Sequence, residues 1–138
     1  MSRFVLDASV IVKWVVQVDE PDAERALALL ASFEKGEVEF LEPPHYLAEV
    51  AAVLTRLCPE RARSMIDALY ELNRHIDLVD SLEAYQVATA LASKLNHHLF
   101  DTLYHAVALI EDVMLITADE RYYHKAASMG AVIRLSDL

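Results

Sequence analysis

Hydrophobic positions along the chain fall into short apolar runs that alternate with longer amphipathic stretches. Five runs have the length and composition of strands, at residues 3–7, 38–43, 76–80, 113–119 and 131–135. The stretches between them predict helices over residues 9–16, 20–36, 44–57, 59–75, 81–96 and 101–112, with a short helix from Glu120. Strands that alternate with helices predict an α/β fold with a central, mostly parallel sheet.

The ends of the predicted helices carry residues that are typical of helix boundaries. Ser9, Ser81 and Asp101 are expected to cap helices, and Gly36 and Pro59 to end them. The links near residues 58 and 97–101 are short, and no repeat, low-complexity tract or linker divides the chain. We therefore expect residues 1–138 to form a single domain.

Four acidic residues interrupt apolar segments of this pattern. Asp7 follows the strand residues "FVL", and Asp119 follows "LITA". Glu49 lies within "YLAEVAAVL", and Asp101 within "LFDTLYHAVAL". A buried carboxylate without a partner is costly, and sites in parallel sheets form at the carboxyl ends of the strands. The sequence therefore predicts that these four carboxylates converge in one pocket at that edge.

Each of the four acids also has a purely structural interpretation. Asp7, Asp101 and Asp119 have the residue type and position of helix caps, and Glu49 could occupy a solvated position on a helix. Acting together, they would instead hold Mg²⁺ or Mn²⁺, which prefer carboxylate oxygens and retained waters. Without metal, mutual repulsion should raise the pKa of some of these carboxylates. With metal, the site could accept a phosphodiester and activate a water molecule.

Composition narrows the classes of function. The net charge is −10, from 12 basic and 22 acidic residues, which argues against a simple electrostatic nucleic-acid binder unless metal ions reverse the sign of the site. No apolar run reaches the ~18 residues that a membrane span needs, and no secretory signal is evident. The single cysteine, Cys58, is compatible with a reducing cytoplasm. The hydrophobic content of 55% suggests a buried interface between two copies of the chain.

Several classes of enzyme are excluded by missing motifs. The only glycines are Gly36 and Gly130, so neither a Walker loop nor a dinucleotide-binding fingerprint can form. The patterns G-x-S-x-G, C-x-x-C and H-E-x-x-H are also absent. Serine hydrolases of that type and the common zinc sites are therefore not expected.

Four motifs, "VLDASVIVKW", "EV" after "PPHYLA", "DTLYHAVAL" and "LITADERYY", together resemble those of PIN-domain proteins, particularly VapC-like toxins of toxin–antitoxin pairs. The resemblance covers nearly the whole chain. It implies a PIN-like three-layer α/β/α sandwich and a magnesium-dependent endoribonuclease whose metal ligands are Asp7, Glu49, Asp101 and Asp119. Ser9 and Thr117 match the hydroxyl positions of the family. A cognate antitoxin and a toxin dimer are further expectations from this resemblance.

Other residues near the four acids have both a functional and a structural interpretation. His105 lies four residues after Asp101 and could reach the site from the same helix face, or could simply pack. His97 and His98 are expected in a loop. Basic residues that could contact RNA phosphates, or be ordinary surface charges, are Arg3, Lys13 and Arg121. Aromatic residues that could stack on bases, or belong to the core, are Trp14, Tyr122 and Tyr123, whereas Tyr46 is expected to pack.

Three other classes of protein share parts of this pattern. A receiver domain needs paired acids after its first strand and a lysine near its last, but "FVLDAS" offers one acid and "AVIRL" offers arginine. A haloacid-dehalogenase-type phosphatase needs D-x-D-x-T, which "DASVI" does not match. A PIN-like module that binds RNA or protein without cleaving it is the remaining alternative to a nuclease.

Overall fold

The computed structural model describes residues 1–138 and contains a five-stranded sheet in which all neighbouring strands are parallel. The strand order is β3-β2-β1-β4-β5. The central strand β1 (Ser2–Leu6) lies between β2 (Val38–Glu42) and β4 (Met114–Thr117). The edge strands are β3 (Asp77–Leu78) and β5 (Val132–Arg134). The predicted α/β class with a parallel sheet is confirmed.

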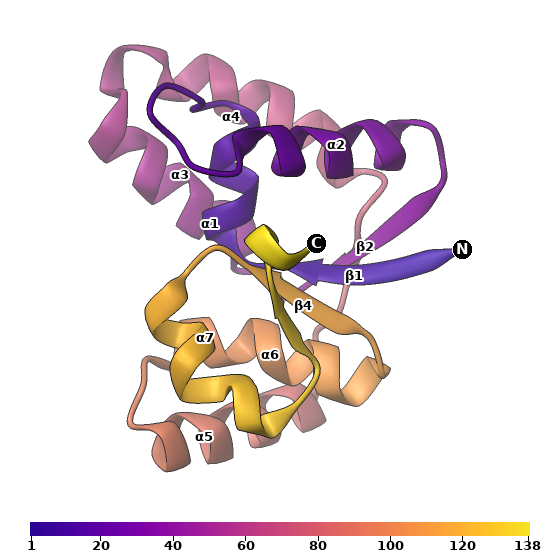
Figure 1. Ribbon diagram of the computed structural model, residues 1–138. Coiled ribbons are helices and arrows are strands. Elements are labelled where there is room, and N and C mark those ends of the chain that lie inside the picture. The colour runs from indigo at the N-terminus through magenta and orange to yellow at the C-terminus, as the bar shows by residue number, and fades with distance from the viewer.

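Helices cover both faces of this sheet (Figure 1). One layer contains α1 (Ala8–Ile11) with its 3₁₀ continuation Val12–Trp14, α2 (Ala23–Glu34), α3 (Tyr46–Leu57) and α4 (Pro59–Asn73). The opposite layer contains α5 (Leu82–Leu95), α6 (Leu99–Glu111) and α7 (Glu120–Ala126). Two further 3₁₀ turns, Ala127–Met129 and Leu135–Asp137, flank β5. No helix combines the length and the apolar character that crossing a membrane requires.

Apolar packing against the sheet accounts for the aromatic residues of uncertain role. Trp14 is buried, stacks on Phe40, and donates a hydrogen bond from Nε1 to the Ala26 carbonyl at 2.9 Å. Tyr46 and Tyr122 are also buried. These side chains belong to the core, so base stacking is not available to Trp14 or Tyr122.

Two predicted helix caps are wrong, and two others are confirmed as caps. Ser9 lies inside α1 rather than before it, because the helix starts at Ala8 and leaves Asp7 as its N-terminal flanking residue. The helix predicted to start at Asp101 begins two residues earlier, at Leu99, so Asp101 lies in its first turn and His98 flanks its N-terminus. Ser81, by contrast, accepts a hydrogen bond from the Ala84 amide at 3.1 Å.

Asp119 is the second confirmed cap. Its Oδ1 accepts a hydrogen bond from the Tyr122 amide at 3.0 Å, at the start of α7. The structural interpretation of this residue is therefore correct, and it does not by itself exclude another role.

A buried carboxylate, Glu42, ends β2 at the centre of the fold. Its Oε1 accepts a hydrogen bond from the Leu6 amide at 2.8 Å, whereas its Oε2 is buried without a partner. Burial raises the pKa of Glu42 well above its ordinary value, and the charge of Asp7 raises it further. Folding therefore favours the protonated form of this side chain.

Replacing Glu42 with glutamine should remove one component of the pH dependence of stability. A pKa that is raised by folding contributes stability that is present below the unfolded value and is lost as pH rises toward the folded value. Relative to wild type, Glu42→Gln should therefore gain stability between pH 5 and pH 8, by at most about 1.4 kcal/mol per pH unit. Urea denaturation in the presence of a chelator measures this difference.

The exposed Glu37→Gln is the matched control, since it makes the same chemical change just before β2. It should follow the wild-type pH profile. Equal profiles for Glu42→Gln and wild type would show that Glu42 titrates in the folded protein as it does in the unfolded chain.

Candidate active site

A pocket of about 380 Å³ opens at the carboxyl edge of the sheet, and all four predicted acids line it. Asp7 follows β1 and Asp119 follows the neighbouring strand β4, so parallel pairing brings these two together. Glu49 reaches the pocket from α3, and Asp101 from the first turn of α6. Four acids that are distant in the sequence therefore meet because four different elements end or begin there.

Two hydroxyl groups fix the orientation of Asp7. Ser9 Oγ and Thr117 Oγ1 both donate hydrogen bonds to Asp7 Oδ2, at 2.8 and 2.9 Å. The same hydroxyls accept hydrogen bonds from backbone amides, Thr117 from Asp119 at 3.0 Å and Ser9 from Ala118 at 3.1 Å. The segments after β1 and β4 are thus joined through one carboxylate oxygen.

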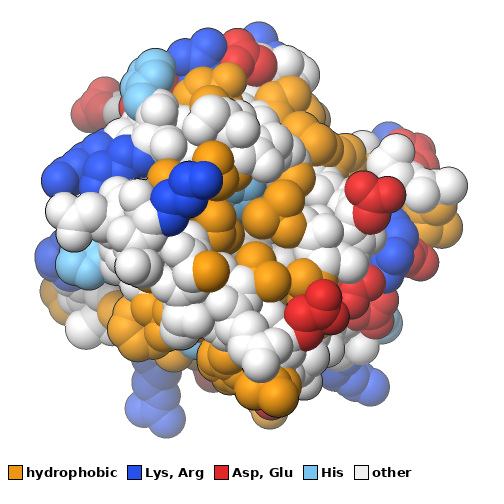
Figure 2. Space-filling model, turned by 90° about the horizontal axis from the view of Figure 1, so that it is seen from below, with side chains coloured by type: hydrophobic (Ala, Val, Ile, Leu, Met, Phe, Trp, Pro, Cys, Tyr) orange, Lys and Arg blue, Asp and Glu red, His pale blue; other side chains and the backbone are white.

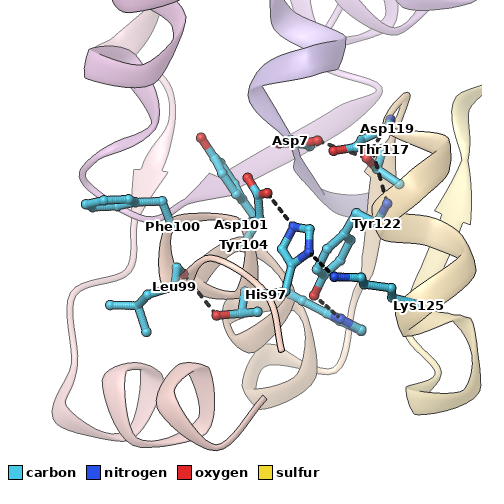
Figure 3. Close-up of polar contacts among 12 residues, drawn as sticks. Asp7, His97, Leu99, Phe100, Asp101, Tyr104, Thr117, Asp119, Tyr122 and Lys125 are labelled. Atoms are coloured by element: carbon cyan, nitrogen blue, oxygen red, sulfur yellow. Dashed lines mark hydrogen bonds and ion pairs between the residues drawn. The ribbon is translucent and has the colours of Figure 1, made fainter. Parts of the chain in front are cut away.

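The two helix acids are each held by a histidine four residues earlier. His45 Nε2 lies 3.0 Å from Glu49 Oε1, and His97 Nε2 lies 2.7 Å from Asp101 Oδ2. Figure 3 shows the His97 ring directed at the Asp101 carboxylate. Glu49 Oε1 also accepts a hydrogen bond from the Tyr104 hydroxyl at 2.7 Å. These partners restrict the rotation of both carboxylates.

The four carboxylates share one pattern of hydrogen bonding. In each of them one oxygen accepts bonds from the protein, and the other accepts none. The engaged oxygens are Oδ2 of Asp7, Oε1 of Glu49, Oδ2 of Asp101 and Oδ1 of Asp119. An oriented carboxylate with one unengaged oxygen is a suitable ligand for a hard cation.

Burial changes the acidity of these groups more than their mutual repulsion does. Burial is the largest cause that raises the pKa of Asp7 to about 6; the Ser9 and Thr117 hydroxyls oppose it, and the charges of Asp101 and Glu49 add to it. Burial likewise raises the pKa of Asp101, against the hydrogen bond from His97. The expected rise is present at these two residues, but repulsion is a secondary cause.

Glu49 departs from the expected direction. Burial by itself would raise its pKa, but hydrogen bonds from His45 and Tyr104, together with the His45 charge, lower the pKa below its ordinary value. Glu49 therefore remains ionised where Asp7 begins to take up a proton. The pocket contains carboxylates of unequal acidity.

The donor set fits a hard divalent cation, although the carboxylates do not enclose one. No three acidic, histidine or cysteine side chains are arranged to hold one ion between them. Mg²⁺ is commonly bound by one or two carboxylates and several retained waters rather than by a closed protein cage. An open pocket that is lined by oriented carboxylates is compatible with that mode of binding.

An ion pair between a buried lysine and a partly exposed glutamate forms one wall of the same pocket. Lys13 Nζ lies 2.7 Å from Glu20 Oε2, and both residues line the pocket. Lys13 is 7% exposed, so the expectation of an ordinary surface charge is wrong for this residue. Glu20 is a fifth acid that the sequence pattern did not indicate, because it lies in a polar segment.

Two residues that the sequence offered as additional contacts, His105 and Arg3, do not line the pocket. His105 is fully buried, and its two ring nitrogens are occupied, Nδ1 by the Tyr122 hydroxyl at 2.9 Å and Nε2 by the Gly130 carbonyl at 2.7 Å. It packs and has no nitrogen free to bind a metal. Arg3 lies near the amino end of the central strand β1, away from the pocket, and pairs there with Glu39 at 3.5 Å.

Some functional candidates were not apparent from the sequence. His45, His97 and Tyr104 contact the pocket acids, but only the two histidines have a recognisable signal, namely a histidine four residues before an acid. Tyr104 is separated from Glu49 by 55 residues. Its contact joins α6 to α3, which lie in different helical layers and meet only at the carboxyl edge of the sheet.

Comparisons with known proteins agree with this architecture. The family model of the PIN domain matches residues 4–128. VapC20 of Mycobacterium tuberculosis, described as a Sarcin-Ricin loop cleaving toxin, has a TM-score of 0.69 and 17% identity to this chain, covering 94% of it and 96% of VapC20. No curated protein sequence matches the chain significantly.

Two further solved structures share the fold. VapBC2 from Rickettsia felis, bound to a DNA fragment from their promoter, has a TM-score of 0.65 and 16% identity, with 96% of this chain and 98% of that chain covered. FitAcB from Neisseria gonorrhoeae has a TM-score of 0.64 and 19% identity, with coverage of 98% and 99%. At such identities the likeness establishes the fold.

The hydroxyl of Thr117 should be important for stability without any metal. Thr117→Val keeps the shape of the side chain but removes the donor to Asp7 and the acceptor for the Asp119 amide. Because Thr117 is fully buried, the variant should lose about 1 to 3 kcal/mol of unfolding free energy in a chelator. The exposed Thr55→Val on α3 is the control, and it should change stability by less than about 0.5 kcal/mol. Equal stabilities of the two variants would contradict the bridging role of Thr117.

Proposed function

Because the chain belongs to the PIN domain family, we propose that it is a divalent-metal-dependent endoribonuclease of the VapC-like kind. The observation that carries this proposal is the arrangement of four carboxylates from four elements, each held through one oxygen and unengaged at the other. The description of VapC20 as a toxin that cleaves the Sarcin-Ricin loop supports RNA as the substrate class.

In this proposal, Asp7, Glu49, Asp101 and Asp119 are the ligands of Mg²⁺ or Mn²⁺. The chemistry that the bound ion supplies is activation of a water molecule and stabilisation of the charge that develops on the phosphate. The reaction is hydrolysis of a phosphodiester bond. The chain itself has to keep its carboxylates ionised and correctly oriented.

The neighbours of the four acids perform that task. Ser9 and Thr117 donate to Asp7 and so favour its charged form against the effect of burial. His97 orients Asp101, and His45 and Tyr104 orient Glu49. Partners of metal-binding side chains typically change metal affinity or activity by about 10- to 100-fold when they are removed.

The proposed partners follow from the same assignment. We propose a cognate antitoxin protein that covers or fills the pocket, and a homodimer of the toxin. VapBC2 and FitAcB share the fold. We also propose that residues 1–138 act as one PIN-like domain in the cytoplasm, where RNA is available and where Cys58, which is free, would stay reduced.

A second candidate is a PIN-like module that binds RNA or protein but does not cleave it. The open spacing of the carboxylates favours it, since no three side chains already enclose an ion. Nuclease and binding module differ in one measurable property, which is divalent-dependent cleavage of RNA.

Neutralising single acids provides that measurement. Asp7→Asn, Glu49→Gln, Asp101→Asn and Asp119→Asn should each lower the Mn²⁺-dependent cleavage rate by about a hundredfold or more, because a metal ion contributes several kcal/mol to stabilising the transition state. Asp67→Asn on α4 removes an exposed acid away from the pocket and should retain full activity. Absence of cleavage by the wild type with either metal would favour the binding module.

Metal binding should also change stability, by an amount that depends on pH. At a hundredfold excess over its dissociation constant, Mn²⁺ should stabilise the protein by about 2.7 kcal/mol near pH 7.5. The stabilisation should be smaller at pH 5, because Asp7, with a pKa of about 6, is then largely protonated. Without metal, the effect of pH on stability is the opposite. The raised pKa of Asp7 contributes unfolding free energy at pH 5, and this contribution is lost as pH rises through 6.

The variant Asp101→Asn distinguishes two effects on stability: the loss of a metal ligand and the loss of a negative charge. In a chelator it should be as stable as the wild type or more so, since its carboxylate is partly desolvated and near other acids. Its response to Mn²⁺ should be much smaller, whereas Asp67→Asn should respond like the wild type. Thermal melts measure all of these differences. A full Mn²⁺ response in Asp101→Asn would remove Asp101 from the set of ligands.

A further inference from the structure

A second pocket, of about 240 Å³, lies next to the carboxylate pocket and has the opposite chemistry. Asn96, His97 and His98 of the connection between α5 and α6 form one side of it, and Arg121 and Lys125 of α7 form the other. None of the five lining residues is acidic or hydrophobic. We call it the basic pocket. Such a composition is unusual in a chain whose net charge is −10.

The two cations of the basic pocket have no carboxylate partner. Arg121 takes part in no ion pair in the structure, and neither does Lys125. Lys125 Nζ donates to the Asn96 carbonyl at 3.1 Å and lies 3.2 Å from His97 Nδ1. Their positive charges are therefore not neutralised within the chain and remain available to an anion.

A chain of contacts links the basic pocket to the carboxylate pocket. His97 Nδ1 contacts Lys125, and Nε2 of the same ring contacts Asp101 Oδ2 at 2.7 Å. Figure 3 shows the imidazole between the ammonium and the carboxylate. The His97 side chain is only 7% exposed, so the ring is fixed in this position. One imidazole ring therefore lies between the Lys125 ammonium of the basic pocket and the Asp101 carboxylate of the other pocket.

The electrostatics of the proposed reaction favour such a site. An RNA strand that approaches four carboxylates is repelled until positive charge compensates for them, and phosphate contacts by lysine and arginine supply most non-specific affinity. On the face shown in Figure 2, the left half carries more Lys, Arg and His side chains than acidic ones, and the acidic side chains nearest the viewer lie at the right. The basic pocket is the place where local charge can favour the strand.

We propose that the basic pocket is a phosphate subsite that holds a backbone phosphate of the RNA beside the linkage to be cleaved. Arg121 can bind phosphate oxygens through its planar guanidinium, and Lys125 contributes a point charge. Asn96 and His98 add hydrogen-bond donors, whereas both ring nitrogens of His97 are already engaged by Lys125 and Asp101. This proposal rests on the proposed function. It adds a substrate-binding site outside the set of carboxylates.

The test uses the double variant Arg121→Gln/Lys125→Gln and a control of equal charge change, Lys35→Gln/Arg63→Gln. The control residues are exposed on α4 and at the end of α2 and have no ion pairs. In Mn²⁺-dependent cleavage of a single-stranded RNA, the double variant should raise KM about tenfold or more and leave kcat within about twofold. The slope of log KM against log salt concentration should fall by about 0.7 for the loss of one phosphate contact.

A second measurement does not depend on catalysis. Inorganic phosphate, added in a chelator, should shift the ring resonances of His97 and His98 in a saturable way, and the double variant should lose this shift while the control keeps it. If the double variant is unstable, Arg121→Gln alone serves, because the Arg121 side chain is exposed and makes no hydrogen bond or ion pair within the chain. It should show an intermediate rise in KM.

The possible outcomes separate this proposal from the proposed function. If the wild type cleaves RNA and the double variant matches the control in KM and salt dependence, the subsite is wrong and the nuclease stands. If the wild type cleaves no RNA, both proposals fail together. If a polyglutamate peptide displaces phosphate from the pocket more strongly than RNA of equal charge, the pocket serves an acidic protein partner and the RNA subsite is overturned.

Discussion

Asp7 Oδ2 receives hydrogen bonds from two hydroxyl groups, Ser9 after β1 and Thr117 at the end of β4, and this junction determines the geometry of the whole carboxyl edge. The two hydroxyls in turn accept the amides of Ala118 and Asp119. The backbone that carries one acid is thus bonded to the side chain of the other. A shift of either segment would misplace both carboxylates, so the pairing of β1 with β4 and the shape of the pocket are one structural constraint.

Bringing carboxylates together at this edge costs stability. Glu42, which does not line the pocket, is also affected by it. Its buried side chain ends β2 with one oxygen unpartnered, and the charge of Asp7 adds to the rise in its pKa. Asp7 itself is kept ionisable by hydroxyl donors rather than by a cation. Lys13 is the only cation that lines the carboxylate pocket, and Glu20 already pairs with it. Positive charge for an anionic substrate must therefore come from bound metal or from the neighbouring basic pocket.

The sequence pattern was sufficient for the fold and for the positions of the four acids. Apolar runs ending in an acid identified β1 and β4, and parallel pairing then required that Asp7 and Asp119 lie at the same edge. Helix starts were less certain. Leu99 and Phe100 extend α6 beyond Asp101, because apolar residues are compatible with both a helix and the loop before it. The burial of Lys13 was not predictable, since it depends on Glu20, a partner in an irregular segment seven residues away.

Contacts between distant elements were beyond any local pattern. Thr117 and Asp7 are 110 residues apart, and Tyr104 and Glu49 are 55 apart, so their hydrogen bonds exist only in the packed structure. The histidine partners are different, because His45 and His97 each lie four residues before the acid they contact. His45 directly precedes α3 and His97 lies two residues before α6, so each ring reaches the acid in the first turn of the helix that follows. A histidine four residues before a helical acid in an apolar setting is therefore a local signal that can be sought in other sequences.

Asp119 shows why a structural and a functional role should not be treated as competing explanations. Its Oδ1 caps α7 by accepting the Tyr122 amide, which is the structural role expected of an aspartate at that position. The same bond fixes the rotation of the carboxylate and leaves Oδ2 unengaged beside the pocket. Capping thus supplies the orientation that a metal ligand needs. In Asp7, Glu49 and Asp101 hydroxyl or imidazole donors have that function, because none of these side chains caps a helix. The four acids reach the same arrangement, one oxygen bound and one available, by different local means.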